Sequence, residues 1–134
     1  MTRPLRILLA DDHQMFRAAL RDLLMSVPGV EVVAETGNGL DIVDLAKAAL
    51  PDIVCMDLGL PGLNGIEATR GLKAACPDAK VIAVSAFVEK RYVLDMLDAG
   101  AVAYVTKIEA GKELLQAVDA VRGNRGGIAM DQQG

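Results

Sequence analysis

Residues 51–65 read PDIVCMDLGLPGLNG, an apolar run that ends on Asp57 and is followed by a sharp turn. Residues 52–56 are too few for a helix and show no helical period, so they predict a strand buried on both faces. The segment 60–63, LPGL, suits a turn because proline presets φ and glycine accepts a positive φ. Asp57 is therefore expected at the carboxyl end of a buried strand.

The residues after this turn predict where the next helix begins. Asn64 is a favourable N-cap residue, and Glu67 stands three positions later. This spacing resembles a capping box, in which each of the two side chains bonds the backbone N–H of the other residue. The strand, the turn and the helix start would together hold Asp57 at one edge of a sheet.

Composition limits the class of protein. A chain of 134 residues with 52% hydrophobic residues predicts one domain with ample material for a core. The net charge of −4 and the absence of clustered Lys and Arg argue against a nucleic-acid surface on this segment. Two cysteines far apart in sequence predict free thiols in a reducing compartment, and no apolar run approaches the ~18 residues of a membrane span. We expect a soluble cytoplasmic protein.

Along the chain, short apolar runs alternate with segments of helical period. The final helical pattern covers about Ala110–Arg122, and a glycine-rich tail without a core pattern follows from Gly123. Earlier helical patterns carry apolar positions 16–27, 42–49, 66–72 and about 88–98, with Gly100 as a C-terminal cap. The predicted strands are Leu5–Ala10, Val30–Thr36, Asp52–Met56, Lys80–Ser85 and Val102–Thr106.

This alternation predicts an α/β fold, a doubly wound five-stranded parallel sheet with helices on both faces. The common flavodoxin-like strand order 2-1-3-4-5 places the first and third strands side by side, where ligands bind beyond their carboxyl ends. Asp11 and Asp12 follow the first strand, and Asp57 follows the third. The three acids should therefore converge in one cleft.

Crowded carboxylates repel one another, and a hard cation relieves that repulsion. Mg²⁺ takes oxygen ligands and usually keeps several waters, which fits an open site with one or two carboxylates and a phosphate oxygen. The alternative for Asp11 and Asp12 is a solvated or capping role at a turn. The position of Asp57 directly after a buried strand favours the metal site.

Two more strand ends complete a predicted phosphate site at the same sheet edge. Ser85 follows the fourth strand and offers a hydroxyl donor, and Lys107 follows the fifth and offers a cation. A phosphoryl group on Asp57 would be stabilised by Mg²⁺, by the Lys107 ammonium and by the Ser85 hydroxyl. Taken separately, Ser85 could simply end a strand and Lys107 could be a solvated surface cation; their joint placement favours the site.

These residues resemble the receiver domain of two-component response regulators, over residues 5–122. The matching motifs are ILLADDH, CMDLGLPGLNG, AVSAF and AGAVAYVTK, and the opening DDHQMFRAAL is similar to the NarL/FixJ subfamily. The resemblance implies that Asp57 accepts a phosphoryl group from a sensor histidine kinase. It also implies that Asp12 and Asp57 bind Mg²⁺ directly, that Asp11 assists through water, and that the Gly59 carbonyl is a further ligand.

The resemblance also implies a switch at Tyr104. Once Asp57 is phosphorylated, Ser85 would be drawn inward and free space into which Tyr104 moves. The altered surface would be built by the helix of residues 88–98, the strand of residues 102–106 and the final helix. The alternative is that Tyr104 is an edge aromatic that covers the sheet. The energetic requirement is that phosphorylation stabilises one of two existing states better than the other.

Three positions depart from the common receiver pattern. Ile108 stands where many receivers have proline after the lysine. A cis peptide bond before isoleucine would cost ~3 kcal/mol, so we expect a trans bond here. Lys107 would then be placed less tightly than in receivers that have the proline. Ser85 replaces the more frequent threonine and lacks its stiff β-branch. Gly59 carries no side chain, which predicts greater solvent access beside the phosphate.

The predicted function is that of a receiver that controls a transcription regulator and is not itself an enzyme. Residues 1–122 would form the receiver, and residues 123–134 a flexible tail that begins a linker to a C-terminal DNA-binding domain absent from this sequence. DNA would be bound only through that domain, no membrane contact is expected, and a homodimer is possible.

Aspartyl-phosphate phosphohydrolases are a competing class, but they generally need an aspartate where Gly59 stands. The other alternative is a stand-alone or phosphorylation-independent receiver that acts as an interaction module.

Overall fold

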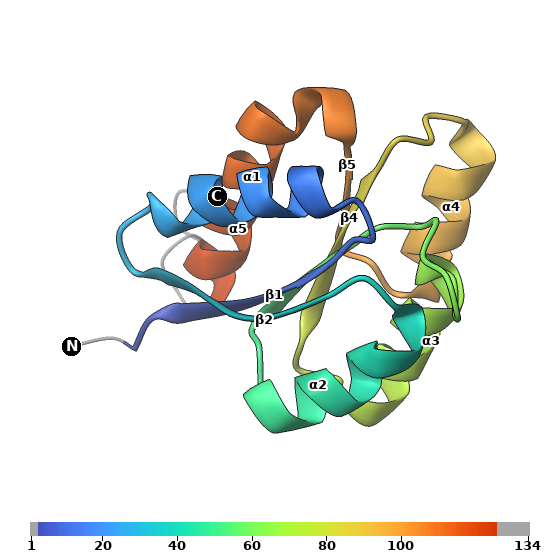
Figure 1. The fold of residues 1–134 in the computed structure, drawn as a ribbon, viewed down its shortest axis with the longest axis horizontal. Coiled ribbons are helices and arrows are strands. Elements are labelled where there is room, and N and C mark those ends of the chain that lie inside the picture. The colour runs from blue at the N-terminus through green and yellow to red at the C-terminus, as the bar shows by residue number, and fades with distance from the viewer. Residues whose placement is uncertain (1–2, 126–134) are drawn as a thin grey trace.

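The computed structural model describes residues 3–125 and shows a parallel sheet of five strands in the order β2-β1-β3-β4-β5. The predicted α/β fold and strand order are therefore confirmed (Figure 1). The carboxyl ends of all five strands meet at one edge, as the parallel pairing requires. The strands are β1 (Leu5–Ala10), β2 (Val30–Thr36), β3 (Ile53–Met56), β4 (Lys80–Ser85) and β5 (Ala103–Thr106).

The helices cover both faces of this sheet. In Figure 1, α1 and α5 lie together above the sheet, and α2 and α3 lie below it. The two buried clusters follow this division, since one contains residues of α1 and α5 and the other residues of α2, α3 and α4. The helices are α1 (Gln14–Met25), α2 (Ile42–Ala49), α3 (Gly65–Ala75), α4 (Lys90–Ala99) and α5 (Ala110–Arg125), with short 3₁₀ turns η1 (Gly39–Asp41) and η2 (Lys107–Glu109).

The central strand β3 is buried along its whole length, as its uninterrupted apolar run predicted. Its side chains contribute to the clusters on both faces, because successive residues of a strand point to opposite sides. Val54 and Met56 pack towards α2, α3 and α4, and Ile53 and Cys55 pack towards α1 and α5. Burial from both sides fixes the register of β3 and therefore the position of Asp57.

The predicted cap of α3 is half confirmed. The Asn64 side chain accepts a hydrogen bond of 3.0 Å from the Glu67 N–H, as expected. The reciprocal bond of a capping box is not formed, because the Glu67 carboxylate instead pairs with Arg70 at 2.6 Å, one turn further along the helix. The capping-box-like pattern thus predicted the helix start and the Asn64 cap, but only one of its two hydrogen bonds forms.

The last helix is longer than predicted. It continues through Arg122 to Arg125, so the first residues of the expected tail are helical. Gly123 is a poor helix former, but a single glycine near a helix end costs only ~1 kcal/mol. The rest of the predicted tail, residues 126–134, lies outside the described residues.

The loop that follows Asp57 is held tightly against the strand end. Gly62 has φ +81°, which confirms the predicted glycine turn. A Cβ at Gly65 would lie 2.2 Å from the Asp57 carbonyl oxygen, so a side chain here would push the start of α3 away from the site. The Gly65 N–H donates to the Leu58 carbonyl at 2.9 Å, which closes the turn.

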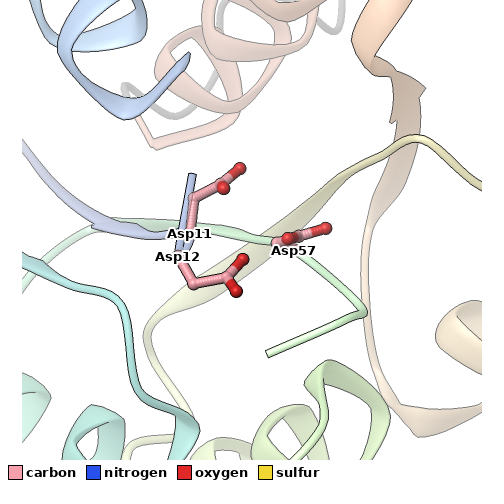
Figure 2. Close-up of side chains that lie close together, drawn as sticks. All are labelled: Asp11, Asp12 and Asp57. Atoms are coloured by element: carbon pink, nitrogen blue, oxygen red, sulfur yellow. The ribbon is translucent and has the colours of Figure 1, made fainter. Parts of the chain in front are cut away.

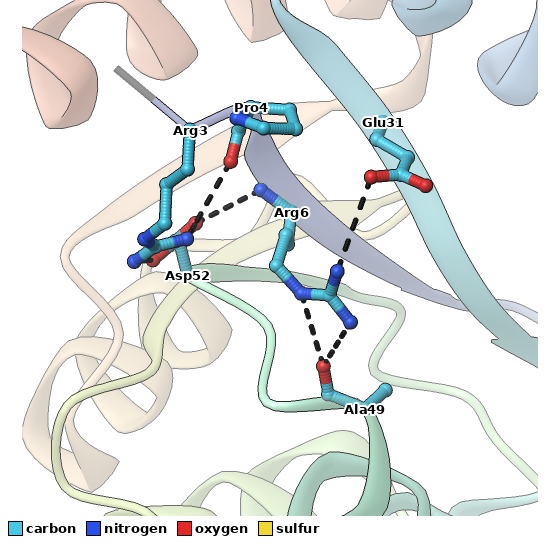
Figure 3. A network of polar contacts seen from close by, with 6 residues as sticks. All are labelled: Arg3, Pro4, Arg6, Glu31, Ala49 and Asp52. Atoms are coloured by element: carbon cyan, nitrogen blue, oxygen red, sulfur yellow. Dashed lines mark hydrogen bonds and ion pairs between the residues drawn. The ribbon is translucent and has the colours of Figure 1, made fainter. Parts of the chain in front are cut away.

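A polar network fastens the opposite edge of the sheet (Figure 3). The Asp52 carboxylate accepts the Arg6 N–H at 2.9 Å and pairs with Arg3 at 2.6 Å. The Arg6 guanidinium donates to the carbonyl of Ala49 at the end of α2, at 2.6 Å and 3.1 Å. These contacts tie the start of β3 to β1 and α2, far from the edge that carries Asp57.

Within residues 3–125, the helices are too short or too polar to span a bilayer.

Candidate functional site

Three carboxylates converge at the carboxyl ends of β1 and β3. The Asp57 N–H donates to the Ala10 carbonyl and the Asp11 N–H to the Thr36 carbonyl, each at 2.9 Å, so both acids continue the sheet hydrogen bonds. One carboxylate oxygen from each of Asp11, Asp12 and Asp57 lies within 4.8 Å of the others. Figure 2 shows the three side chains close together where β1 and β3 end. The predicted convergence of these acids is found.

The three acids differ in exposure. Asp11 is 3% exposed and Asp57 is 7% exposed, whereas Asp12 is open to solvent. Asp11 also accepts the His13 N–H at 2.8 Å, which orients its side chain at the start of α1. The site is therefore buried on one side and open on the other, as a site that binds both a hydrated cation and a phosphate would require.

Lys107 supplies the positive charge of the cluster. Its ammonium lies 2.9 Å from an oxygen of Asp11 and 3.6 Å from an oxygen of Asp57, and its side chain is 15% exposed. The bond before Ile108 is trans, as expected, since residues 3–125 contain no cis peptide. Two ion pairs hold the ammonium beside the acids, and the expectation that Lys107 is placed less tightly than in receivers with proline at position 108 stays a prediction.

Burial and charge together set the protonation of Asp57. Burial raises the pKa of this carboxyl, and the neighbouring charge of Asp11 raises it further. Lys107 and a backbone hydrogen bond from Gly59 act in the opposite direction without cancelling the rise in pKa. A cation placed among the three carboxylates would favour the ionised form, which is the form able to act as a nucleophile.

Ser85 and Tyr104 are linked through the loop between β4 and α4. The Ser85 hydroxyl is fully buried and accepts the Phe87 N–H at 3.0 Å. The Tyr104 hydroxyl donates to the Phe87 carbonyl at 2.8 Å, and burial of the phenol raises its pKa. Tyr104 thus contacts this loop through its hydroxyl, and its role in a switch stays a prediction.

Gly59 lies at the exposed side of the site, two residues after Asp57. A Cβ built at this position meets only a Phe87 ring carbon at 3.7 Å, so a side chain would fit. The small residue therefore leaves the approach to Asp57 more open than packing requires. The role of its carbonyl as a metal ligand stays a prediction.

Arg17 was not identified from the sequence. Its guanidinium donates to the Asp11 carbonyl through Nη1 and to Glu35 through Nε, the latter at 3.1 Å. Arg21, one turn later, pairs with the same carboxylate at 3.0 Å. The available signal was two arginines four residues apart on one helix and two acids, Glu31 and Glu35, in a largely apolar strand, a pattern that also fits a solvated helix face.

The comparisons with known proteins agree with this geometry. The family model for the response regulator receiver domain matches residues 7–119. Response regulator UvrY of Escherichia coli O6:H1 is 35% identical over 95% of this chain, and response regulator GacA of Pseudomonas viridiflava is 37% identical over 87%. A solved two-component response regulator of the LuxR family from Aurantimonas sp. SI85-9A1 superposes with a TM-score of 0.84 at 39% identity, covering 90% of this chain and 86% of that one.

The chain spans only part of the curated relatives, 58% of UvrY and 55% of GacA. The matched part contains the whole sheet except the first residues of β1. The LuxR-family relative confirms the resemblance to NarL/FixJ-type regulators that the opening motif indicated. The match over residues 7–119, together with the sheet order and the acidic cluster, shows that this chain belongs to the response regulator receiver domain family.

Proposed function

We propose that this chain is a phosphorylation-controlled switch in which a sensor histidine kinase phosphorylates Asp57 in a Mg²⁺-dependent reaction. The observation that carries the proposal is the gathering of Asp11, Asp12, Asp57 and Lys107 from the ends of three strands. Such a group of acids with one buried cation serves no packing purpose at an open sheet edge. It is suited to bind a cation and a phosphoryl group together.

Asp57 is the nucleophile in this proposal. One carboxylate oxygen attacks the phosphorus atom carried by the kinase histidine, and the new P–O bond forms as the P–N bond breaks. The imidazole nitrogen keeps the electron pair of that bond and takes up a proton. The product is a mixed anhydride, which water hydrolyses to free carboxylate and inorganic phosphate.

The donor set fits Mg²⁺. Oxygens of Asp11, Asp12 and Asp57 lie within 4.8 Å of one another. Asp12 is exposed, so water molecules could fill the remaining ligand positions of the ion. Asp12 and Asp57 would bind the ion directly, with Asp11 through water and the Gly59 carbonyl as a further ligand. Bound there, the ion would neutralise charge on the phosphoryl oxygens. Lys107 would bind another of those oxygens, and Ser85 would donate to a third.

The switch would run from Ser85 to Tyr104. Both residues contact Phe87, one through its N–H and the other through its carbonyl. Movement of the Ser85 hydroxyl towards a phosphoryl oxygen would release the Phe87 N–H and alter the loop that holds Tyr104. The surface of α4, β5 and α5 would change together with this loop. The protein would then switch between two discrete packing arrangements.

The output would be transcription control by a longer protein. The relatives are named as response regulators, and this chain corresponds to little more than half of them. We propose that residues 1–122 are the phosphoacceptor unit, that residues 123–134 begin a linker, and that DNA is bound through a C-terminal domain. A cytoplasmic location and a homodimer, through α1 with α5 or through the face around Tyr104, are part of the proposal.

Intact-protein mass spectrometry tests the central step. The chain is incubated with Mg²⁺ and a small acyl-phosphate donor, beside the Asp57→Asn variant. A Mg²⁺-dependent, slowly decaying phosphoryl adduct on the native chain alone is the expected result. A folded native chain that binds Mg²⁺ without forming an adduct would instead indicate an interaction module that works without phosphorylation. Rapid multiple turnover of the donor would indicate a phosphohydrolase.

A further inference from the structure

The ring of Phe16 lies against the ammonium of Lys107. The Nζ atom is 4.6 Å from the ring centroid, within the ~6 Å range in which a cation is attracted to an aromatic face. Phe16 is in the first turn of α1, whereas Lys107 follows β5, so the contact joins two elements far apart in sequence. The aromatic ring therefore borders the site through Lys107.

Lys107 needs such a restraint because one side of it is open. It lines a pocket of about 540 Å³ together with residues 13–16. Its four-carbon stem is flexible, and the following residue, Ile108, is 89% exposed and adds no packing. Asp11 and Asp57 attract the ammonium from one side only. The Phe16 ring, itself part of the pocket wall, supplies a further contact that limits how far the ammonium can move.

An aromatic face suits this task better than a third carboxylate would. The ring attracts the cation through its quadrupole and occupies none of the three N–H donors of the ammonium in a strong hydrogen bond. A carboxylate in the same place would take a donor and neutralise the charge. Phe16 adds no further negative charge beside the ammonium, whose N–H donors stay available to Asp11, to Asp57 and to an incoming phosphoryl oxygen.

We propose that Phe16 is a positioning residue for phosphoryl transfer to Asp57, acting through the ammonium of Lys107; this inference rests on the proposed function. Phe16 does not contact the transferred group. Its ring holds Lys107 at the edge of the acidic cluster, where the ammonium meets the phosphoryl oxygens. Removal of the ring's negative face should slow the transfer while the metal ligands and the fold remain intact.

The test separates ring electrostatics from ring packing. Phe16 also packs against the buried cluster beneath α1 and α5, so Phe16→Ala could simply destabilise the fold. Site-specific replacement with mono-, di- and trifluorinated phenylalanine keeps the shape of the ring and progressively weakens its attraction for a cation. Phe16→Leu removes the ring and keeps an apolar side chain. Each protein is compared in phosphorylation rate, Mg²⁺ half-saturation and urea unfolding.

A graded loss of rate is the expected result. The rate of adduct formation from an acyl-phosphate donor should fall with each added fluorine, by about two- to fivefold over the series, and Phe16→Leu should match the trifluorinated protein. The Mg²⁺ half-saturation and the urea midpoint of the fluorinated proteins should stay at native values. In NMR spectra, the ε-methylene protons of Lys107 should show an upfield ring-current shift that Phe16→Leu abolishes.

Three results would overturn the inference. A native chain that is phosphorylated at the same rate as every fluorinated protein would remove the positioning role and leave the proposed function standing. A rate that falls only in parallel with the urea midpoint or with Mg²⁺ affinity would make Phe16 a packing residue. A native chain that forms no adduct would reject the proposed function and the positioning role together.

Discussion

Lys107 follows β5 and nevertheless lies 2.9 Å from a carboxylate oxygen of Asp11, which follows β1. Strands β3 and β4 lie between these two strands in the sheet, so the lysine reaches across both to form the pair. The same ammonium is 3.6 Å from Asp57. Lys107 is thus the cation that offsets the repulsion between two buried acids when no metal is bound.

Loss of Lys107 should therefore destabilise the metal-free fold. Lys107→Met would leave Asp11 and Asp57 buried without a positive partner, which we expect to lower the free energy of unfolding by ~1–3 kcal/mol at pH 7. Urea unfolding with and without Mg²⁺ measures the effect, and Mg²⁺ should restore part of the loss. Lys112→Met, on the exposed side of α5, makes the same chemical change away from the acids. Equal effects of the two substitutions would contradict the argument.

Asp57→Asn should stabilise the metal-free fold at neutral pH. Burial and Asp11 raise the pKa of Asp57 in the folded chain, so its ionised form costs folding free energy. The folded state holds the proton more tightly than the unfolded state, so the native chain loses stability as pH rises from about 4 through the folded-state pKa. The difference between variant and native chain should grow over that window and then level off.

Urea unfolding at a series of pH values measures this difference. Asp44→Asn is a matched control. Asp44 is exposed on α2, so the substitution makes the same chemical change outside the site. Saturating Mg²⁺ should reverse the sign and make the native chain the more stable one, since the cation favours three charged ligands. A stability difference that does not vary with pH would show that ionisation of Asp57 is not its cause.

Arg17 should support the proposed metal site through the backbone of Asp11. Its planar guanidinium donates to both the Asp11 carbonyl and Glu35. The single ammonium of a lysine cannot reproduce this pair of contacts. Arg17→Lys should therefore lower Mg²⁺ affinity severalfold and the free energy of unfolding by ~1 kcal/mol. Arg21→Lys is the matched control, since Arg21 pairs with Glu35 but not with the loop of Asp11. Isothermal titration with Mg²⁺ would separate the two, and equal losses of affinity would exclude a specific role for Arg17.

The strands were predictable because each is an apolar run with clear limits. The bounds of β1, β2 and β4 match the sequence prediction, and β3 and β5 each begin one residue later, at Ile53 and Ala103. The parallel order then brought Asp11, Asp12 and Asp57 to one edge without knowledge of any side-chain position. Residues at strand ends are predictable in this fold because topology alone places them.

The contacts made by helix side chains were not predictable in the same way. Phe16 was correctly interpreted as an apolar position of α1, but its contact with Lys107 depends on how α1 rotates against β5. The contact of Arg17 with Glu35, on the same turn of the helix, depends on that rotation too. Glu67 illustrates the limit at short range, because Arg70 competes for its carboxylate and prevents the reciprocal cap. Helix periodicity predicts which face is buried and leaves the individual partners undetermined.

Tyr104 offers a direct test of the loop between β4 and α4. Tyr104→Phe keeps the ring and removes the hydroxyl that donates to the Phe87 carbonyl at 2.8 Å. We expect a loss of about 1 kcal/mol in unfolding free energy and faster amide hydrogen exchange in residues 86–90, because the loop loses its bond to β5. Tyr92→Phe is the control. The Tyr92 hydroxyl lies at the surface, where it accepts a hydrogen bond of 3.0 Å from Arg91. If exchange in the loop were unchanged in Tyr104→Phe, the loop would be held by Ser85 alone, and the proposed path from Asp57 to the α4 surface could not pass through the Tyr104 hydroxyl.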